Sequence, residues 1–190
     1  MHVHLETERL ILRRFTPEDV DLLMELDSDP EVMRYLSGGR ATPREEVEER
    51  ILPLYFSYYR RFPALGYWAA LERAGGGFLG WFEFRPPDPD RPDEVELGYR
   101  LRRPAWGRGY ATEGARALIR KGFGEPGVER VFAQTMTVNR GSRRVMEKAG
   151  LRYVRTFFAD WPEAIDGSEH GEVEYALERA EWHRLQPGPR

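Results

Sequence analysis

The chain contains no cysteine among its 190 residues. Disulfides, thiolate zinc sites and cysteine nucleophiles are therefore excluded. Long apolar runs are also missing. No stretch is long enough to cross a bilayer, and the N-terminus lacks the apolar region of a signal peptide. We therefore expect a cytoplasmic protein without a membrane partner and without a bound metal.

The chain has little net charge, −3 in total, so its overall composition does not favour nucleic acid as a partner. The segment from residue 100 to residue 121 differs from the rest of the chain. It contains one acid, Glu113, and seven basic residues: Arg100, Arg102, Arg103, Arg108, Arg116, Arg120 and Lys121. Such a segment suits a polyanionic ligand. The alternative is an arginine-rich face that only contacts solvent.

Length and composition predict one globular domain, residues 1–182, followed by a flexible tail, residues 183–190, that ends in Gln186-Pro-Gly-Pro-Arg190. Strands are predicted at residues 8–14, 67–71, 78–84, 94–101, 128–138, 151–158 and 173–177. Helices are predicted after Thr16 and Thr42, after Gly109 and over residues 140–149, with a kink at Pro53. This order indicates an α/β (α+β) fold, with a mixed, mostly antiparallel seven-stranded sheet flanked by about four helices.

Residues 94–113 predict a strand, a glycine turn and a helix in direct succession. Apolar side chains alternate along the strand at Val95, Leu97, Tyr99 and Leu101. Gly107 and Gly109 then form the turn that opens the helix. Such a turn presents unpaired backbone N–H groups and the positive end of the helix dipole, which predicts a phosphate or pyrophosphate site.

Three segments together resemble the GNAT superfamily of N-acetyltransferases. Two are Pro104-Ala-Trp-Gly-Arg-Gly-Tyr-Ala-Thr-Glu113 and Val138-Asn-Arg-Gly-Ser-Arg-Arg-Val-Met-Glu-Lys-Ala-Gly-Leu151. The third, Leu5-Glu-Thr-Glu-Arg-Leu-Ile-Leu-Arg-Arg14, is similar to the start of the RimJ/RimL-type subgroup, which acetylates ribosomal proteins. The resemblance implies a GNAT-type fold and acetyl-CoA as cosubstrate. Pro104 departs from the family pattern, which usually has Gln or Arg there.

The resemblance also implies which residues hold acetyl-CoA. The pyrophosphate would lie on the turn and the first helical residues: Gly107, Arg108, Gly109, Tyr110, Ala111 and Thr112. The pantetheine arm would pair with the strand backbone at Tyr99 and Leu101, and a bulge at Gly98 would free that strand from its neighbour. Asn139 would contact the arm and cap the following helix. The rings of Trp106 and Tyr110 are expected to be packing aromatics.

Two residues are the catalytic candidates. Glu96 lies on the strand face opposite Leu97 and matches a family glutamate, which implies a base; the alternative is a surface carboxylate paired with an arginine. Ser142 would contact the cofactor and protonate the departing thiolate, because Met146 stands where many members have a tyrosine. The alternative for Ser142 is an ordinary place in the first helical turn. Asp160 is the second choice for the base.

The acceptor is expected to be a primary amine, with a protein N-terminal α-amine as the first choice. A small-molecule amine such as an antibiotic or polyamine is the alternative, and a non-catalytic CoA-binding module is the alternative of another class. Transfer would be direct, since no cysteine can carry the acetyl group. The acceptor would bind between residues 37–40, the second helix and residues 158–171. Acids in that last loop favour cationic acceptors: Asp160, Glu163, Asp166 and Glu169. His170 is expected to be a turn residue, and a homodimer is compatible with the family.

Overall fold

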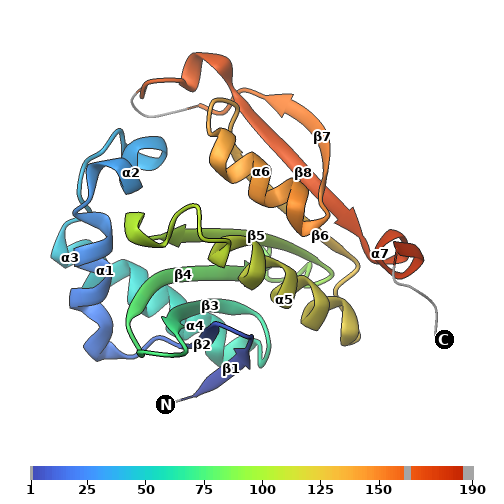
Figure 1. The fold of residues 1–190 in the computed structure, drawn as a ribbon, viewed down its shortest axis with the longest axis horizontal. Coiled ribbons are helices and arrows are strands. Elements are labelled where there is room, and N and C mark those ends of the chain that lie inside the picture. The colour runs from blue at the N-terminus through green and yellow to red at the C-terminus, as the bar shows by residue number, and fades with distance from the viewer. Residues whose placement is uncertain (1, 161–163, 186–190) are drawn as a thin grey trace.

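The computed structural model describes residues 2–160 and 164–185 and contains an eight-stranded sheet in the order β1-β2-β3-β4-β5-β6-β8-β7 (Figure 1). Neighbouring strands are antiparallel except β5 and β6, which are parallel. The predicted mixed, mostly antiparallel sheet is confirmed, with one strand more than the seven expected.

The elements have the following bounds. The strands are β1 Val3–Glu6, β2 Leu10–Arg14, β3 Gly66–Glu72, β4 Phe78–Arg85, β5 Glu94–Leu101, β6 Arg130–Met136, β7 Arg152–Phe157 and β8 Glu172–Glu178. The helices are α1 Val20–Asp27, α2 Pro30–Ser37, α3 Arg44–Glu46, α4 Leu52–Arg61, α5 Tyr110–Gly124, α6 Arg140–Ala149 and α7 Arg179–Leu185. In the described part of the chain, no helix has the length and apolarity needed to span a membrane.

Two elements near the N-terminus were not predicted. The first strand was expected over residues 8–14, but β1 precedes it and β2 begins only at Leu10, after a bend in which Thr7 Oγ1 accepts from the Leu10 N–H at 2.9 Å. Helix α2 was also missed. Its start carries a local signal, because the Asp29 side chain accepts from the Glu31 N–H at 3.0 Å and Pro30 occupies the first turn.

The helix after Thr42 forms, although its start differs from the prediction. Thr42 does not cap it; its hydroxyl donates to Asp27 Oδ2 at 2.6 Å, and Pro43 stands at the cap position. Pro53 is accommodated by a π-helical turn over Val47–Ile51, which joins α3 to α4. In a π turn each backbone hydrogen bond spans five residues instead of four. This wider spacing lets the helix continue past a proline that would otherwise break it.

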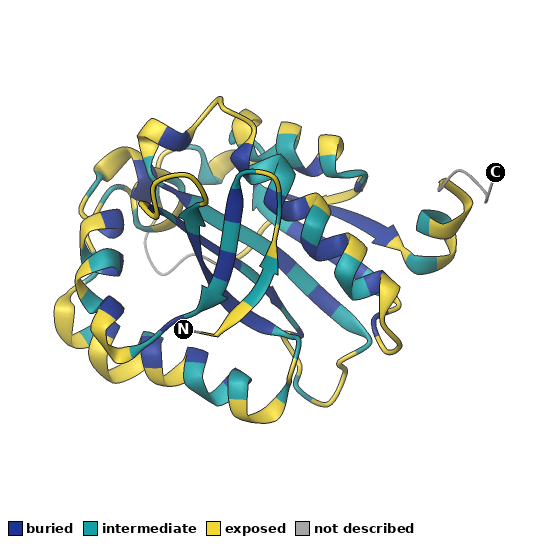
Figure 2. Ribbon diagram, turned by 60° about the horizontal axis from the view of Figure 1, so that its bottom comes forward, coloured by how far each residue is buried: buried dark blue, intermediate teal, exposed yellow. Residues whose placement is uncertain are grey.

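The helices cover the two faces of the sheet. On one face Phe82 and Phe84 of β4 lie under α5, where a Cβ at Gly114 would stand only 2.3 Å from the Phe82 ring. On the other face Trp81 packs with Tyr67 and with the apolar sides of α1 and α4. Figure 2 shows the outer sides of these helices exposed and their inner sides buried. Each face of the N-terminal half therefore has its own apolar core.

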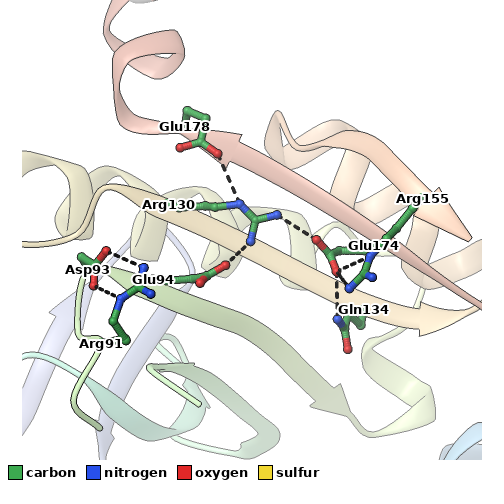
Figure 3. A network of polar contacts seen from close by, with 8 residues as sticks. All are labelled: Arg91, Asp93, Glu94, Arg130, Gln134, Arg155, Glu174 and Glu178. Atoms are coloured by element: carbon green, nitrogen blue, oxygen red, sulfur yellow. Dashed lines mark hydrogen bonds and ion pairs between the residues drawn. The ribbon is translucent and has the colours of Figure 1, made fainter. Parts of the chain in front are cut away.

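A buried carboxylate joins the three strands at the C-terminal side of the sheet. Glu174 of β8 accepts from Arg130 of β6 at 2.8 Å, from Arg155 of β7 at 2.8 Å and from Gln134 at 3.1 Å (Figure 3). The predicted boundary of the flexible tail at residue 183 is wrong for its first residues, because residues 183–185 complete the helix α7. Residues 186–190 of the predicted tail lie outside the described residues.

Candidate active site

A notch opens in the sheet between β5 and β6. The two strands are paired only at their first residues, ending with Glu96 opposite Phe132, whereas β5 continues along β4 as far as Leu101. In Figure 1 the ribbons of α6 and β8 lie above that of β5. The notch is therefore walled by an unpaired length of β5 and by the segment that leads from β6 into α6.

The free edge of β5 presents backbone groups to this notch. Arg102 donates its N–H to the Leu79 carbonyl on β4 at 2.8 Å. Because residues of an antiparallel strand alternate between bonding to the partner and pointing away, Tyr99 and Leu101 direct their backbone groups away from β4. This geometry fits the expectation that both residues pair with an extended pantetheine arm.

The bulge predicted at Gly98 is absent. Gly98 pairs with Glu83 in the regular β4–β5 register, and β5 is freed because β6 leaves it to pair with β8 alone. Gly98 also has no positive φ. Its lack of a side chain has another cause: a Cβ at Gly98 would lie 2.3 Å from Glu83 Oε1.

The turn before α5 has the conformation that its glycines allow. Gly107 and Gly109 have φ angles of 71° and 85°, in the left-handed region where residues with a Cβ are strained. Gly109 is the N-cap residue and supplies no side chain, so nothing on it covers the first N–H groups of the helix, Tyr110 to Thr112. Those groups have no intrahelical acceptor and point out along the helix axis. The cradle fits a pyrophosphate group.

Contacts with the β1–β2 turn hold this cradle in place. Arg9 donates from Nη1 to the Arg108 carbonyl at 2.9 Å and from Nε to Glu113 at 2.7 Å. Glu113 also accepts from the Thr7 hydroxyl at 2.6 Å. The N-terminal segment thereby fixes the position of the turn without occupying its outward N–H groups.

The two aromatics beside the turn differ. Tyr110 is a packing residue as predicted: it is buried, and its hydroxyl donates to Glu72 Oε1 at 2.6 Å. Trp106 is 47% exposed, so its ring is not part of the core. Its indole N–H donates to the Leu101 carbonyl at 2.6 Å, which engages one of the backbone groups at the end of the notch.

The other wall of the notch carries Asn139 and Ser142. Asn139 caps α6 as predicted, with Oδ1 accepting from the Ser142 N–H at 3.2 Å and Nδ2 donating to Thr135 Oγ1 at 3.1 Å. Ser142 meets Tyr99, whose hydroxyl lies 3.1 Å from Ser142 Oγ and donates to the Ser142 carbonyl at 3.0 Å. Burial raises the pKa of Tyr99, so the phenol keeps its proton. The side chain of Tyr99 thus connects the two walls.

Glu96 lies at the closed end of the notch, on the sheet face opposite Leu97. Its Oε2 accepts from Arg85 Nη2 at 2.8 Å, and Arg85 Nε donates to Glu83 Oε2 at 2.8 Å. Burial, helped by the Glu83 charge and opposed by Arg85, raises the pKa of Glu96 to about 7. Glu96 is paired with an arginine, as the alternative interpretation held, but its side chain is only 22% exposed and is not an ordinary surface carboxylate.

Glu83 and Arg85 were not among the candidates chosen from the sequence. Their signal was nevertheless present: two charged residues alternate with phenylalanines in a strand that is otherwise mostly apolar, and charged residues are rarely buried unless they are paired. Glu83 and Arg85 lie two residues apart on one strand and contact each other, but the contact of Arg85 with Glu96 joins two strands and cannot be predicted from spacing alone.

The loop before β8 lies near the end of α2. Ile165 is so close that a Cβ at Gly38 would stand 3.0 Å from its Cγ2. Asp160, Asp166 and Glu169 line a shallow hollow in the loop. His170 ends a short 3₁₀ turn, as expected for a turn residue. Glu163 lies outside the described residues.

The basic segment does not form one patch. Arg100 pairs with Asp27 at 2.6 Å, Arg102 pairs with Glu25 of α1, and Arg103 pairs with Asp29, which caps α2. Arg108, by contrast, stands beside the α5 cradle and lies over the Tyr110 ring at 5.2 Å. Among the residues that the structure describes, no group of histidines and acids is arranged to hold a metal ion.

The chain belongs to the GNAT acetyltransferase family, since the model of the acetyltransferase (GNAT) domain matches residues 9–152. It is 38% identical over 188 residues to "FsC-acetyl coenzyme A-N(2)-transacetylase" of Aspergillus fumigatus, covering 96% of this chain and 79% of that protein. The chain is therefore an acetyl-CoA-dependent N-acetyltransferase, not a non-catalytic CoA-binding module.

Solved structures share the fold. The ribosomal-protein α-N-acetyltransferase RimL in complex with coenzyme A has a TM-score of 0.78 at 17% identity and covers 93% of this chain and 98% of its own. Spermidine N-acetyltransferase from Vibrio cholerae, in complex with CoA and spermine, has a TM-score of 0.75 at 14% identity and covers 93% and 99%. At these identities the likeness concerns the fold alone.

Proposed function

We propose that this enzyme transfers the acetyl group of acetyl-CoA directly to a primary amine, with Glu96 as the base and Ser142 as the proton donor. The observation that carries the proposal is the position of Glu96: a partly buried carboxylate, with a pKa of about 7, at the closed end of a notch whose other wall carries Ser142. A base whose pKa lies near the working pH combines a useful ionised fraction with a useful driving force for proton removal.

The two ends of the notch take separate parts of the acetyl-CoA. The outward N–H groups from Tyr110 to Thr112 fit the pyrophosphate, and the free edge of β5 at Tyr99 and Leu101 fits the pantetheine arm. Arg108 adds a positive charge beside the cradle. Bound there, acetyl-CoA supplies an acetyl group that its thioester already activates. The protein then contributes mainly orientation of the amine and the acetyl group.

Each protein group has a distinct part in the transfer. Glu96 accepts a proton from the incoming ammonium, directly or through water. A backbone N–H on the free edge of β5, at Leu97 or Tyr99, donates to the acetyl carbonyl oxygen as charge develops on it. Ser142, joined to Tyr99, gives a proton to the thiolate that leaves.

The acceptor is a primary amine that reaches Glu96 from the side of α2 and the loop before β8. A protein N-terminal α-amine is the first candidate, consistent with the RimJ/RimL-like N-terminal segment. A small-molecule amine is the second, and the relative at 38% identity favours it, because its name describes acetylation at a nitrogen designated N(2). Acids on this side favour a cationic acceptor in both cases, since Asp160, Asp166 and Glu169 line its loop.

The cellular setting stays a prediction. We place the enzyme in the cytoplasm, without nucleic acid as a partner, and we propose residues 1–182 as one catalytic domain. A homodimer is proposed from the family resemblance.

Mass spectrometry of amines incubated with the enzyme and acetyl-CoA tests the function. The panel comprises N-terminal peptides, polyamines and aminoglycosides. We expect one class to gain a single acetyl group, and Glu96→Gln to slow that reaction about 100-fold or more without weakening CoA binding. Glu94→Gln is the matched control, because Glu94 lies on the same strand and face but pairs with Arg130. Wild-type turnover in Glu96→Gln would remove Glu96 from the mechanism.

A further inference from the structure

One arginine bridges two partly buried carboxylates at the closed end of the notch. Arg85 donates one hydrogen bond from Nε to Glu83 and another from Nη2 to Glu96, each at 2.8 Å. The side chains of Glu83, Arg85 and Glu96 are 14%, 18% and 22% exposed. The planar guanidinium holds both contacts at fixed angles, so the orientation of one carboxylate depends on the other.

Glu83 can take this position only because residue 98 has no side chain. The Glu83 carboxylate lies across β5, with Oε1, Cγ and Cδ at 2.3, 2.8 and 2.9 Å from the place of a Cβ on Gly98. The backbone of Gly98 has no positive φ, so strand geometry alone would accept alanine there. The glycine is needed by the glutamate on the neighbouring strand.

We propose that Glu83 is a positioning residue for the base: through Arg85 it fixes the direction of the Glu96 carboxylate, and Gly98 provides the space in which it does so. This inference rests on the proposed role of Glu96. Arg85 engages Oε2 of Glu96, which leaves Oε1 as the oxygen that meets the amine. Without Glu83, the guanidinium has one anchor fewer and the carboxylate loses its fixed direction.

The two partners of this network, Glu83 and Arg85, are expected to shift the pKa of Glu96 in opposite directions. The charged groups that act on Glu96 are Glu83 and Arg85 of β4 and Glu172 of β8. Glu172 is itself a carboxyl group whose pKa burial raises. The ring centre of Tyr67 on β3 lies 5.9 Å from the guanidinium carbon of Arg85. The Tyr67 hydroxyl keeps its proton because burial raises the pKa of Tyr67. Glu83 therefore raises and Arg85 lowers the pKa of Glu96.

Titration of the Glu96 carboxyl carbon by NMR, in the wild-type protein without acetyl-CoA, tests this coupling. The signal is assigned by its loss in Glu96→Gln. We expect Glu83→Gln to move the Glu96 titration to lower pH and Arg85→Met to move it to higher pH, each by about one pH unit. The acidic limb of kcat/KM should move in the same two directions. Shifts in the same direction, or none, would overturn the proposal.

A double-mutant cycle tests the part played by Gly98. Gly98→Ala should displace the Glu83 carboxylate without changing any charge, and we expect kcat to fall about tenfold with little change in KM for acetyl-CoA. In a Glu83→Ala background, Gly98→Ala should lower kcat no further, because the glutamate side chain that it would displace is absent. Equal losses from Gly98→Ala in both backgrounds would show that Gly98 serves only the strand.

Two controls separate the possible failures. Glu178→Gln removes a strand carboxylate that pairs with Arg130, outside the notch, and should leave the Glu96 titration unchanged. Thermal melting of each variant shows that it is folded. If wild-type protein acetylates no amine while the NMR shifts appear, the proposed function fails and the coupling stands. If turnover is intact and Glu96 titrates alike in all variants, the coupling fails and the function stands.

Discussion

The hydroxyl of Tyr99 on β5 lies 3.1 Å from the hydroxyl of Ser142 on α6, and it also donates to the Ser142 carbonyl at 3.0 Å. These two side chains come from opposite walls of the notch. Because the Tyr99 proton is directed to the carbonyl, the Ser142 hydroxyl can donate either to the Tyr99 oxygen or to a group in the notch. The two hydroxyls therefore form one hydrogen-bonded unit, which the proposed mechanism uses to protonate the thiolate.

We predict that Ser142→Ala and Tyr99→Phe each lower kcat about 100-fold while KM for acetyl-CoA changes little. The double variant should lose little more than either single one, since residues that act as a unit are not additive. Steady-state kinetics of the four proteins checks this. Multiplied losses in the double variant would mean two independent roles, and unchanged turnover in Ser142→Ala would remove the proposed acid.

Gly109→Val should raise KM for acetyl-CoA about tenfold or more. The residue has φ 85°, which a β-branched side chain adopts with strain, and a Cβ there would stand 3.3 Å from Arg9 Nη2 beside the cradle. Gly76→Val is the matched control. It has φ 70° in the β3–β4 turn with no atom within 4 Å of the Cβ position. We expect both variants to melt at lower temperature, but only Gly109→Val to weaken the response of the melting temperature to CoA.

The rate should rise with pH through neutrality. The pKa of Glu96 is raised to about 7, first by burial and then by Glu83, so the base is protonated below that pH and ionised above it. We expect kcat/KM for a fixed amine to fall about tenfold for each pH unit on the acidic side. In Glu96→Gln this limb should disappear from the much slower reaction. If Glu96→Gln shows the same fall of kcat/KM at acidic pH, the titrating group is not Glu96.

Glu174 should stabilise the fold in a pH-dependent way. Burial raises the pKa of its carboxyl group, but hydrogen bonds from Arg130, Arg155 and Gln134 outweigh burial and lower it. A pKa lower in the folded than in the unfolded protein means a contribution that is complete above the unfolded value and lost as pH falls through the folded one. Glu174→Gln should therefore lower the free energy of unfolding by about 2 kcal/mol at neutral pH.

Urea unfolding of wild type and Glu174→Gln at neutral and acidic pH checks that prediction, and the difference between them should shrink as the pH falls below about 4. Glu178→Gln removes an exposed partner of the same arginine and should cost less than about 1 kcal/mol. A constant difference at all pH values would indicate lost packing instead of a lost charge.

Much of the fold was predictable because its signals are local. Alternation of apolar residues predicted β3, β4 and β5, and glycines in the left-handed region begin α5 and end α6. The short elements β1 and α2 were not predicted. Strand β1 has four residues and gains its stability from pairing with β2, and the role of Gly98 depends on a carboxylate from another strand.

The amino-acid sequence by itself determined the family, the glycine turn that opens α5 and the face on which Glu96 lies, because a glycine turn, a helix start and a period of two are each specified within a few residues. Only the tertiary structure decided how β5 is freed, which groups surround Glu96 and which hydroxyl meets Ser142. These depend on strands and helices that are distant in sequence: β6 leaves β5 for β8, Arg85 joins Glu83 to Glu96, and Tyr99 reaches α6. Local spacing does not specify contacts between distant segments, and the chemistry of this site consists of such contacts.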